Sequence, residues 1–174
     1  MRDIWLISDT HFCHENFLNF TDKDGNKIRK FDSVSHMNEH MVECWNSVVK
    51  PGDKVYHLGD VYMGDTEVFK ILWPRLNGSK NLIVGNHDRI KFFASGSFFK
   101  NIYMWRRLDN LLLTHVPVHE SVLGEARFSS LTNPKPKIKN IHGHIHHNPS
   151  PTKNHICVCV EQINYTPVNI EELL

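Results

Sequence analysis

Histidine side chains recur along this chain at short spacings that suit metal binding. The stretch NIHGHIHHN (140–148) places four of the 13 histidines within six positions. In an extended chain, side chains two residues apart share a face, which would put His142, His144 and His146 on one side and His147 on the other. Such a group can grip a metal ion but cannot complete its coordination. The rest of the chain must therefore supply partners.

Candidate partners follow short apolar runs that are typical of buried strands. We predict strands over 2–8, 54–58, 80–84 and 110–115, and a further strand that ends near residue 142. The polar residues come directly at or after these runs: Asp9 and His11, Asp60, Asn86 and His87, His115, then His144 and His146. Ligands of α/β sheets gather where strands end and loops begin. We therefore expect these side chains to meet at one sheet edge.

The elements that must position these residues can be predicted from periodicity and turn signals. A helix is expected over 35–49, with Ser35 as its N-cap, and a second over 65–76 that Pro74 bends or ends. Two strands are expected within 98–118, one over 155–163, and a helical turn at 169–174. Strands alternate with helices early and follow one another late. The fold class indicated is α/β, with helices packed on two stacked, largely mixed sheets.

Length and composition narrow the class of protein. The 174 residues fit one domain, 1–174, and leave little room for a cap domain. Twenty Lys and Arg against 19 Asp and Glu give no global basic field of the kind that marks a dedicated nucleic-acid binder. The chain shows neither a signal peptide nor an apolar run long enough to span a bilayer. We expect a cytoplasmic protein without a membrane partner; its oligomeric state is left open.

The motifs D-x-H, G-D, G-N-H-D, H and G-H-x-H occur in this order between Asp9 and His146, across most of the chain. This series resembles the calcineurin-like metallophosphoesterases. The stretches DTHFCHEN, WNSVVKPGDKVYHLGD and GNHDR are similar to the small bacterial and phage branch of that superfamily. Any one motif alone is weak, whereas the ordered set is highly specific. The resemblance implies a four-layer αββα sandwich with two metal ions at the sheet edge.

The resemblance also implies a division of the ligands between the two ions. One ion would be held by Asp9, His11 and His146, and Asp60 would bridge both. The other would be held by Asn86, His115 and His144. This mixed nitrogen and oxygen set suits Mn²⁺, with Fe²⁺ or Zn²⁺ also compatible, better than Ca²⁺. The activity implied is hydrolysis of a phosphate mono- or diester by in-line attack of a metal-bridging hydroxide.

The proton for the leaving alcohol would come from His87, the histidine of G-N-H-D. In many relatives a carboxylate three residues beyond the G-D aspartate steadies this histidine, but here that position is Met63. Asp88 or Asp65 could replace this carboxylate, or the histidine–carboxylate dyad is absent. We take His87 and Asp88 as the candidate catalytic residues.

Three further residues are candidate substrate contacts: His14, Asn16 and Arg89. His14 could instead be a surface histidine, and Arg89 part of a surface ion pair.

Two alternative functions remain open at this point. A metal-dependent nuclease on single-stranded nucleic acid gains support if the basic clusters converge on the metal edge. These clusters are Lys23, Lys27, Arg29 and Lys30; Arg106 and Arg107; and Lys135, Lys137 and Lys139. Charge runs of this kind are more often solvated faces. The other alternative is a non-catalytic scaffold or binding module with the same fold, although each metal motif position is filled here.

Overall fold

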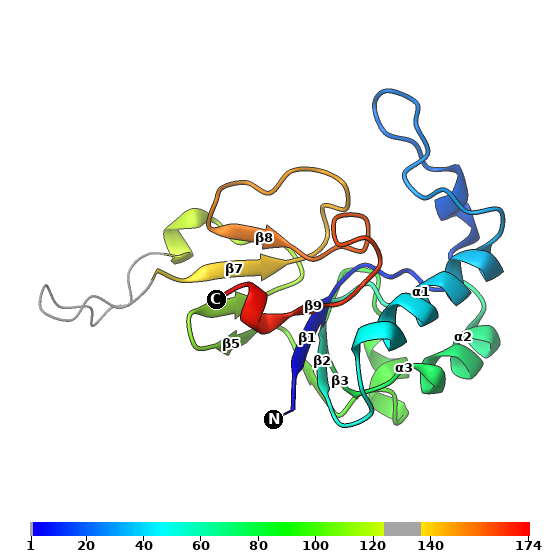
Figure 1. Ribbon diagram of the computed structural model, residues 1–174, viewed down its shortest axis with the longest axis horizontal. Coiled ribbons are helices and arrows are strands. Elements are labelled where there is room, and N and C mark those ends of the chain that lie inside the picture. Colours follow the sequence, from blue (N-terminus) through cyan, green and yellow to red (C-terminus); the bar gives the residue numbers. More distant parts are fainter. Residues whose placement is uncertain (1, 124–136) are drawn as a thin grey trace, which may run out of the picture.

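Two mixed β-sheets pack face to face at the centre of the molecule (Figure 1). The structure is a computed structural model that describes residues 2–123 and 137–174. The five-stranded sheet has the order β4-β3-β2-β1-β9, with β4 Asn101–Tyr103, β3 Ser79–Ile83, β2 Lys54–His57, β1 Ile4–Ile7 and β9 Val168–Asn169. The four-stranded sheet has the order β5-β6-β7-β8, with β5 Arg106–Leu108, β6 Leu111–Leu113, β7 Lys139–His142 and β8 His155–Cys157.

Each sheet combines parallel and antiparallel pairs. Strands β1 to β4 run parallel to one another, and β9 returns antiparallel to β1. In the second sheet β6, β7 and β8 are parallel and β5 is antiparallel to β6. The predicted class of two stacked mixed sheets is therefore confirmed.

The central strands are apolar at successive positions because both faces of their sheet are covered. In β1, Ile7 packs into the core beneath the helices, whereas its neighbour Leu6 packs into the core between the sheets. Leu82 and Ile83 of β3 divide in the same way. Burying such a side chain completely contributes about 1.5–3 kcal/mol. The continuous apolar runs that predicted buried strands thus reflect two separate cores.

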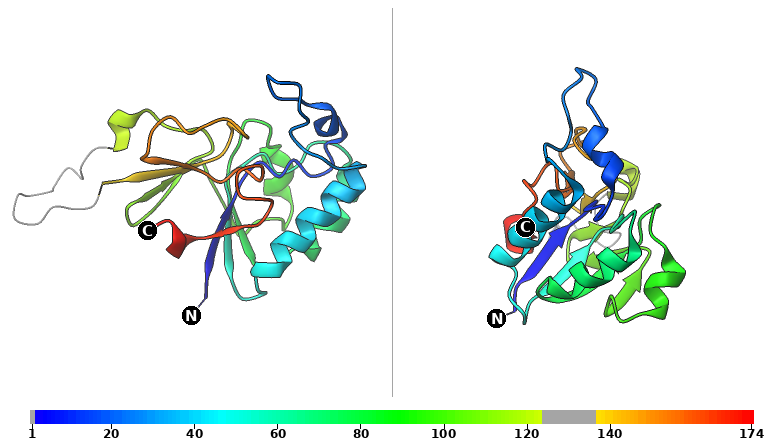
Figure 2. Two further views of the ribbon diagram at one scale, coloured as in Figure 1. Left: turned by 45° about the horizontal axis from the view of Figure 1, so that its top comes forward. Right: turned by 90° about the vertical axis from the view of Figure 1, so that its right-hand side faces the viewer.

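Three α-helices cover the outer face of the five-stranded sheet (Figures 1 and 2). They are α1 Val34–Val48, α2 Thr66–Leu72 and α3 Ile90–Ser95; the 3-10 helices are η1 Glu15–Asn19, η2 Trp73–Arg75, η3 Glu120–Leu123 and η4 Ile170–Glu172.

Helix α1 buries Met37, Met41 and Trp45, which recur every four residues along one face. Its N-cap is Ser33, whose side chain accepts a hydrogen bond from His36 N, so the prediction of Ser35 was wrong by two residues.

The outer layer over the four-stranded sheet is thinner. Among the described residues it consists of η3 and the chain around it, where Val122 lies with Leu112 and Ile138 around a shallow hollow. None of the helices in the described ranges is both long and apolar enough to cross a bilayer. The expectation of one domain without a cap remains a prediction.

The two sheets are joined at one edge by a short parallel bridge between Ser8 and Cys159. Ser8 N donates to Val158 O at 2.8 Å, and Val160 N donates to Ser8 O at 3.2 Å. Because Ser8 directly follows β1 and Cys159 lies just beyond β8, this seam holds the ends of both sheets together. The polar motif residues lie on either side of it.

Candidate metal centre and adjoining pocket

The carboxyl ends of strands from both sheets supply the candidate ligands. Loops after β1, β2 and β3 carry Asp9 and His11, Asp60, and Asn86; chain segments after β6 and β7 carry His115, His144 and His146. All seven predicted ligands lie within two adjoining clusters.

The first cluster contains Asp9, His11 and His146. Asp9 Oδ1 lies 3.8 Å from His11 Nε2 and 3.7 Å from His146 Nε2. One ligand atom from each residue falls within 4.8 Å of the other two. Two imidazole nitrogens and one carboxylate oxygen therefore lie close enough to one another to bind a single divalent metal ion.

The second cluster contains Asp60, His115 and His144, with Asn86 beside them. Asn86 Oδ1 lies 2.8 Å from His115 Nε2 and 3.0 Å from His144 Nδ1. Asp60 Oδ2 lies 3.4 Å from His115 Nε2 and also 3.7 Å from His11 Nε2 of the first cluster. Asp60 thus stands between the two clusters, the position expected of a bridging ligand.

Two ligand atoms in the first cluster are buried without a hydrogen-bond partner among the described residues: Asp9 Oδ1 and His11 Nε2. Unpaired buried polar atoms are rare because each forfeits its hydration. Burial also raises the pKa of Asp9 and lowers the pKa of His11 to about 2, so that His11 is a neutral imidazole with a free lone pair. A divalent cation between these two atoms would satisfy both.

Asp60 and His115 form the charged pair of the second cluster. Burial disfavours both charges, but their mutual hydrogen bond and attraction, with help from Asp9, raise the pKa of His115 to about 9 and lower that of Asp60 to about 2. Leu58 O contacts His115 Nδ1 at 2.7 Å and orients the ring. A histidine must be neutral to ligate a metal ion, so a cation bound at His115 would take the place of the proton on its ring.

The backbone at the ligands is held in an uncommon conformation. Positive φ angles occur at five of the seven predicted ligands: Asp9 (57°), His11 (45°), Asp60 (55°), His144 (70°) and His146 (50°). A non-glycine residue in this region stores about 1–3 kcal/mol and persists where the surrounding fold enforces it. Such strain concentrates at functional sites.

This conformation corrects one step of the sequence argument. The prediction that His142, His144 and His146 share one face of an extended chain was wrong, because β7 ends at His142 and the next residues turn. His144 and His146 nevertheless reach separate clusters. His142 is buried, and its Nε2 lies 3.1 Å from Ser150 Oγ.

Glu161 is a site residue that the sequence argument missed. Its Oε1 lies 3.2 Å from His146 Nδ1 and so orients the ring with Nε2 toward Asp9. Carboxylates placed behind a metal-ligating histidine fix its tautomer and strengthen its lone pair. Glu161 also forms a possible alternative ligand group with His146 and Cys159. No local motif marks it, because it lies well beyond G-H-x-H.

Arg29 completes this arrangement from a distant loop. It is fully buried; its Nε donates to Glu161 Oε1 at 2.8 Å, and its Nη2 forms an ion pair with the same oxygen at 2.6 Å. Its remaining N–H groups donate to the carbonyls of Asp9 and Thr10 at 2.6 and 2.7 Å. The prediction of a solvated or substrate-steering Arg29 was therefore wrong. Lys135 of the third basic cluster lies outside the described residues.

Asp88 anchors loops. Its carboxylate accepts from the backbone N–H groups of Asp60 and Gly85, at 3.0 and 2.8 Å, and from Val61 N at 2.9 Å. These contacts tie the loop after β2 to the loop after β3. Asp88 thus fixes the two ligand-bearing loops relative to each other. This is a positioning role, whereas the sequence argument predicted a catalytic one.

His87 lies at the mouth of the centre. Its backbone N–H donates to Asp60 Oδ1 at 2.8 Å, and its ring centroid is 5.8 Å from that of His11. Within the described residues, no carboxylate hydrogen-bonds its ring; Asp65, one of the two suggested partners, caps α2 instead. A His87–carboxylate dyad is thus missing from the described part of the chain.

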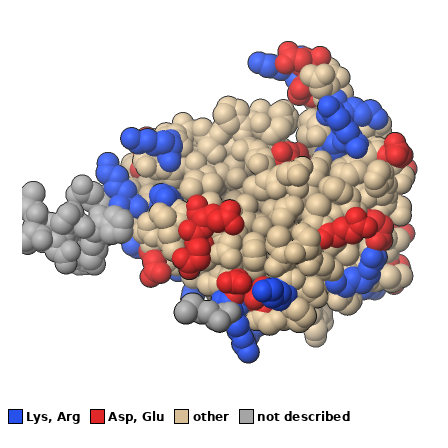
Figure 3. Space-filling view, viewed as in Figure 1, with Lys and Arg blue, Asp and Glu red and all other residues tan. Residues whose placement is uncertain are grey.

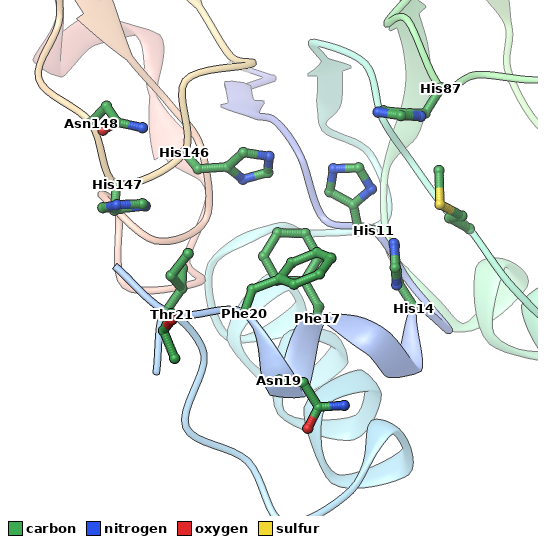
Figure 4. Close-up of a pocket in the computed structure, with 12 residues that line it drawn as sticks. His11, His14, Phe17, Asn19, Phe20, Thr21, His87, His146, His147 and Asn148 are labelled. Atoms are coloured by element: carbon green, nitrogen blue, oxygen red, sulfur yellow. The ribbon is translucent and has the colours of Figure 1, made fainter. Parts of the chain in front are cut away.

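A pocket of about 610 Å³ opens beside the first cluster. Figure 4 shows the rings of His11, His14, His87 and His146 on one side and those of Phe17 and Phe20 close by. Of the predicted substrate contacts, only His14 lines this pocket. Asn16 lies in a neighbouring hollow, which it shares with His14.

Arg89 points elsewhere. Its Nη1 lies 3.3 Å from Tyr62 Oη and 3.4 Å from Thr66 Oγ1, and its guanidinium covers Phe92. The structure therefore does not bring Arg89 into the pocket.

No family model matches the chain. A solved structure described as a protein of unknown function, AQ665 from Aquifex aeolicus, superimposes with a TM-score of 0.71 at 25% identity, covering 99% of this chain and 98% of that one. The Gene 66 protein of Mycobacterium phage D29 is 28% identical over 168 residues, which are 84% of this chain and 79% of that protein.

The uncharacterized protein MJ1445 of Methanocaldococcus jannaschii is 34% identical over 180 aligned residues, which include 98% of this chain and 89% of that protein. A match of this extent includes both halves of the candidate centre, from Asp9 to His146. The chain therefore belongs to the same protein family as MJ1445.

Proposed function

We propose that this protein is a dinuclear metallophosphoesterase of the calcineurin-like superfamily, which hydrolyses a phosphate mono- or diester. One observation carries the proposal: two clusters of imidazole and carboxylate ligands meet at Asp60, the only described residue whose carboxylate approaches a ligand nitrogen of each cluster. The orphaned Asp9 Oδ1 and His11 Nε2 support a cation at the first cluster. Mn²⁺ fits the mixed donors best, with Fe²⁺ or Zn²⁺ as alternatives.

Two divalent ions held by these ligands would supply an activated water and would neutralise the charge on the phosphate oxygens. The chain's own residues do the remaining work. Asp9, Asp60, Asn86 and the four ligand histidines would hold the ions, and Glu161 keeps His146 in place. His87 stands exposed at the pocket next to His11, from where its ring can donate a proton to a departing alcohol oxygen.

The test combines direct metal binding with turnover. Titration calorimetry of the metal-free protein should show two Mn²⁺ ions bound per chain, and bis-p-nitrophenyl phosphate should be hydrolysed in their presence. Asp60→Asn should lose one bound ion and the turnover. Asp65→Asn removes a carboxylate of the same type from the cap of α2 and should change neither. Turnover by Asp60→Asn equal to that of the parent would refute the proposal.

A nuclease acting on single-stranded nucleic acid is the second candidate. The hairpin between η1 and α1 borders the pocket through Thr21 and Ile28 and carries exposed Lys23 and Lys27. At the tip of this hairpin, at the top of the view in Figure 3, basic side chains stand beside acidic ones. These cations could attract a polyanion. Salt-dependent cleavage of short single-stranded oligonucleotides would favour this candidate.

We place the protein in the cytoplasm. All four cysteines are free, which suits a reducing compartment.

A further inference from the structure

We propose that the pocket beside the metal centre receives a flat, uncharged aromatic group joined to the phosphate of the substrate. The inference rests on the proposed function and specifies its substrate class. It predicts a phosphoester whose alcohol bears an aryl ring or a nucleobase, with no second anionic group next to it.

The first ground is an aromatic wall within reach of the reacting phosphate. The ring centroid of Phe17 lies 5.2 Å from that of His11 and 5.2 Å from that of His146. Phe20 lies next, 5.1 Å from Phe17 and 5.8 Å from His14. A group attached to a phosphate bound near His11 and His146 would therefore lie next to the rings of Phe17 and Phe20 (Figure 4).

The second ground is that the outer ring of this wall, Phe20, is exposed, while the inner ring, Phe17, is buried and held in place. Phe20 is 44% exposed, an unusual state for a phenylalanine whose neighbours are other rings. Phe17, by contrast, is fixed from behind, because the buried Arg29 guanidinium lies 3.9 Å from its ring centroid. An arriving ring can stack on Phe20 without reordering the surface beneath it.

The third ground is the charge of the lining. The described residues around the pocket are histidines, apolar side chains and neutral polar groups such as Thr21 and Asn148; no Lys, Arg, Asp or Glu is among them. A second phosphate would find no lysine or arginine in the described lining, so the charge of the reacting phosphate is met by the metal centre and the histidines beside it.

The test measures binding of two probes that differ only in the base. Adenosine 5'-monophosphate and ribose 5-phosphate, each with its 5'-oxygen replaced by a methylene group so that it cannot be hydrolysed, are titrated calorimetrically into the Mn²⁺-loaded protein. The adenine should tighten binding by about tenfold, within the range of a single base stacked on an aromatic side chain. Phe20→Ala should abolish that difference and Phe20→Tyr should retain it. Phenyl phosphate against methyl phosphate shows whether a simple aryl group suffices or a base is required.

Trp105→Ala provides the matched control, because Trp105 is an exposed aromatic residue that lines a different hollow. It should leave both affinities unchanged. Equal affinity of the parent protein for the two sugar phosphates, or an adenine gain that survives in Phe20→Ala, would overturn the pocket assignment while leaving the metal centre intact. Failure of inorganic phosphate and both sugar phosphates to bind with Mn²⁺ present would instead overturn the proposed function, and this inference with it.

Discussion

Replacing Arg29 by methionine should strongly destabilise the fold. Methionine retains much of the length of the side chain but leaves the carboxylate of Glu161 buried without its cation. Arg29 is fully buried and the Glu161 side chain is 3% exposed, with 2.6 Å between their nearest atoms. Removing one partner of a buried pair typically costs about 3–5 kcal/mol. The carbonyls of Asp9 and Thr10 lose their donors as well.

The chain contains a matched comparison for this prediction. Arg75 pairs with Glu39 at the same 2.6 Å, but these side chains are 43% and 46% exposed. Water compensates the charges at such a site, and a pair of this kind contributes about 0–1 kcal/mol. Arg75→Met should therefore lower the free energy of unfolding far less than Arg29→Met.

Urea unfolding of the metal-free proteins measures both effects. The double substitution Arg29→Met with Glu161→Gln removes the orphaned charge, so it should be less destabilising than the sum of the two single substitutions. Similar losses for Arg29→Met and Arg75→Met, or strict additivity in the double variant, would refute the argument from burial.

Four further predictions concern the centre itself. Glu161→Gln should weaken Mn²⁺ binding by about 10–100-fold in calorimetric titration, as expected for the carboxylate behind a ligand histidine; unchanged affinity would contradict this role. Gly143→Ala should lower stability by about 1–3 kcal/mol in urea and impair Mn²⁺ binding, because a Cβ there would collide with the Asp9 carboxylate. Asp88→Asn should lower the free energy of unfolding by about 1–3 kcal/mol and with it the melting temperature, because an amide nitrogen would face backbone N–H donors. An unchanged melting temperature would exclude the anchoring role. Mn²⁺ at one hundred times its Kd should stabilise the parent by about 2.7 kcal/mol per site, and EDTA should reverse the effect in a thermal melt.

The main elements could be predicted because their signals are local. The apolar stripe of α1, the Pro74 stop after α2 and the apolar strands each lie within a few residues of sequence. Boundaries were less accurate where the chain turns: the expected strand 155–163 is only His155–Cys157, and the region 98–118 holds three short strands instead of two. Helix α3 was not predicted, since Ile90–Ser95 is too short for a periodic pattern to emerge.

The candidate ligands could be predicted as a set because their motifs follow strands, and parallel strands bring their ends together. Their supporting residues could not. Arg29 and Glu161 are 132 residues apart, and neither sits in a pattern that distinguishes it from a surface charge. The left-handed backbone at Asp9 and Asp60 could not be predicted from the sequence either, because it depends on how the chain packs at the junction of the sheets.

The seam between Ser8 and Cys159 has a consequence for biosynthesis. As the chain leaves the ribosome, Ser8 emerges long before Cys159, its neighbour in the seam. Strand β9, which borders β1, follows later still. Until these segments have emerged, Asp9 and His11 lie at an open sheet edge, so on the proposed function the nascent chain would not bind metal ions before that point.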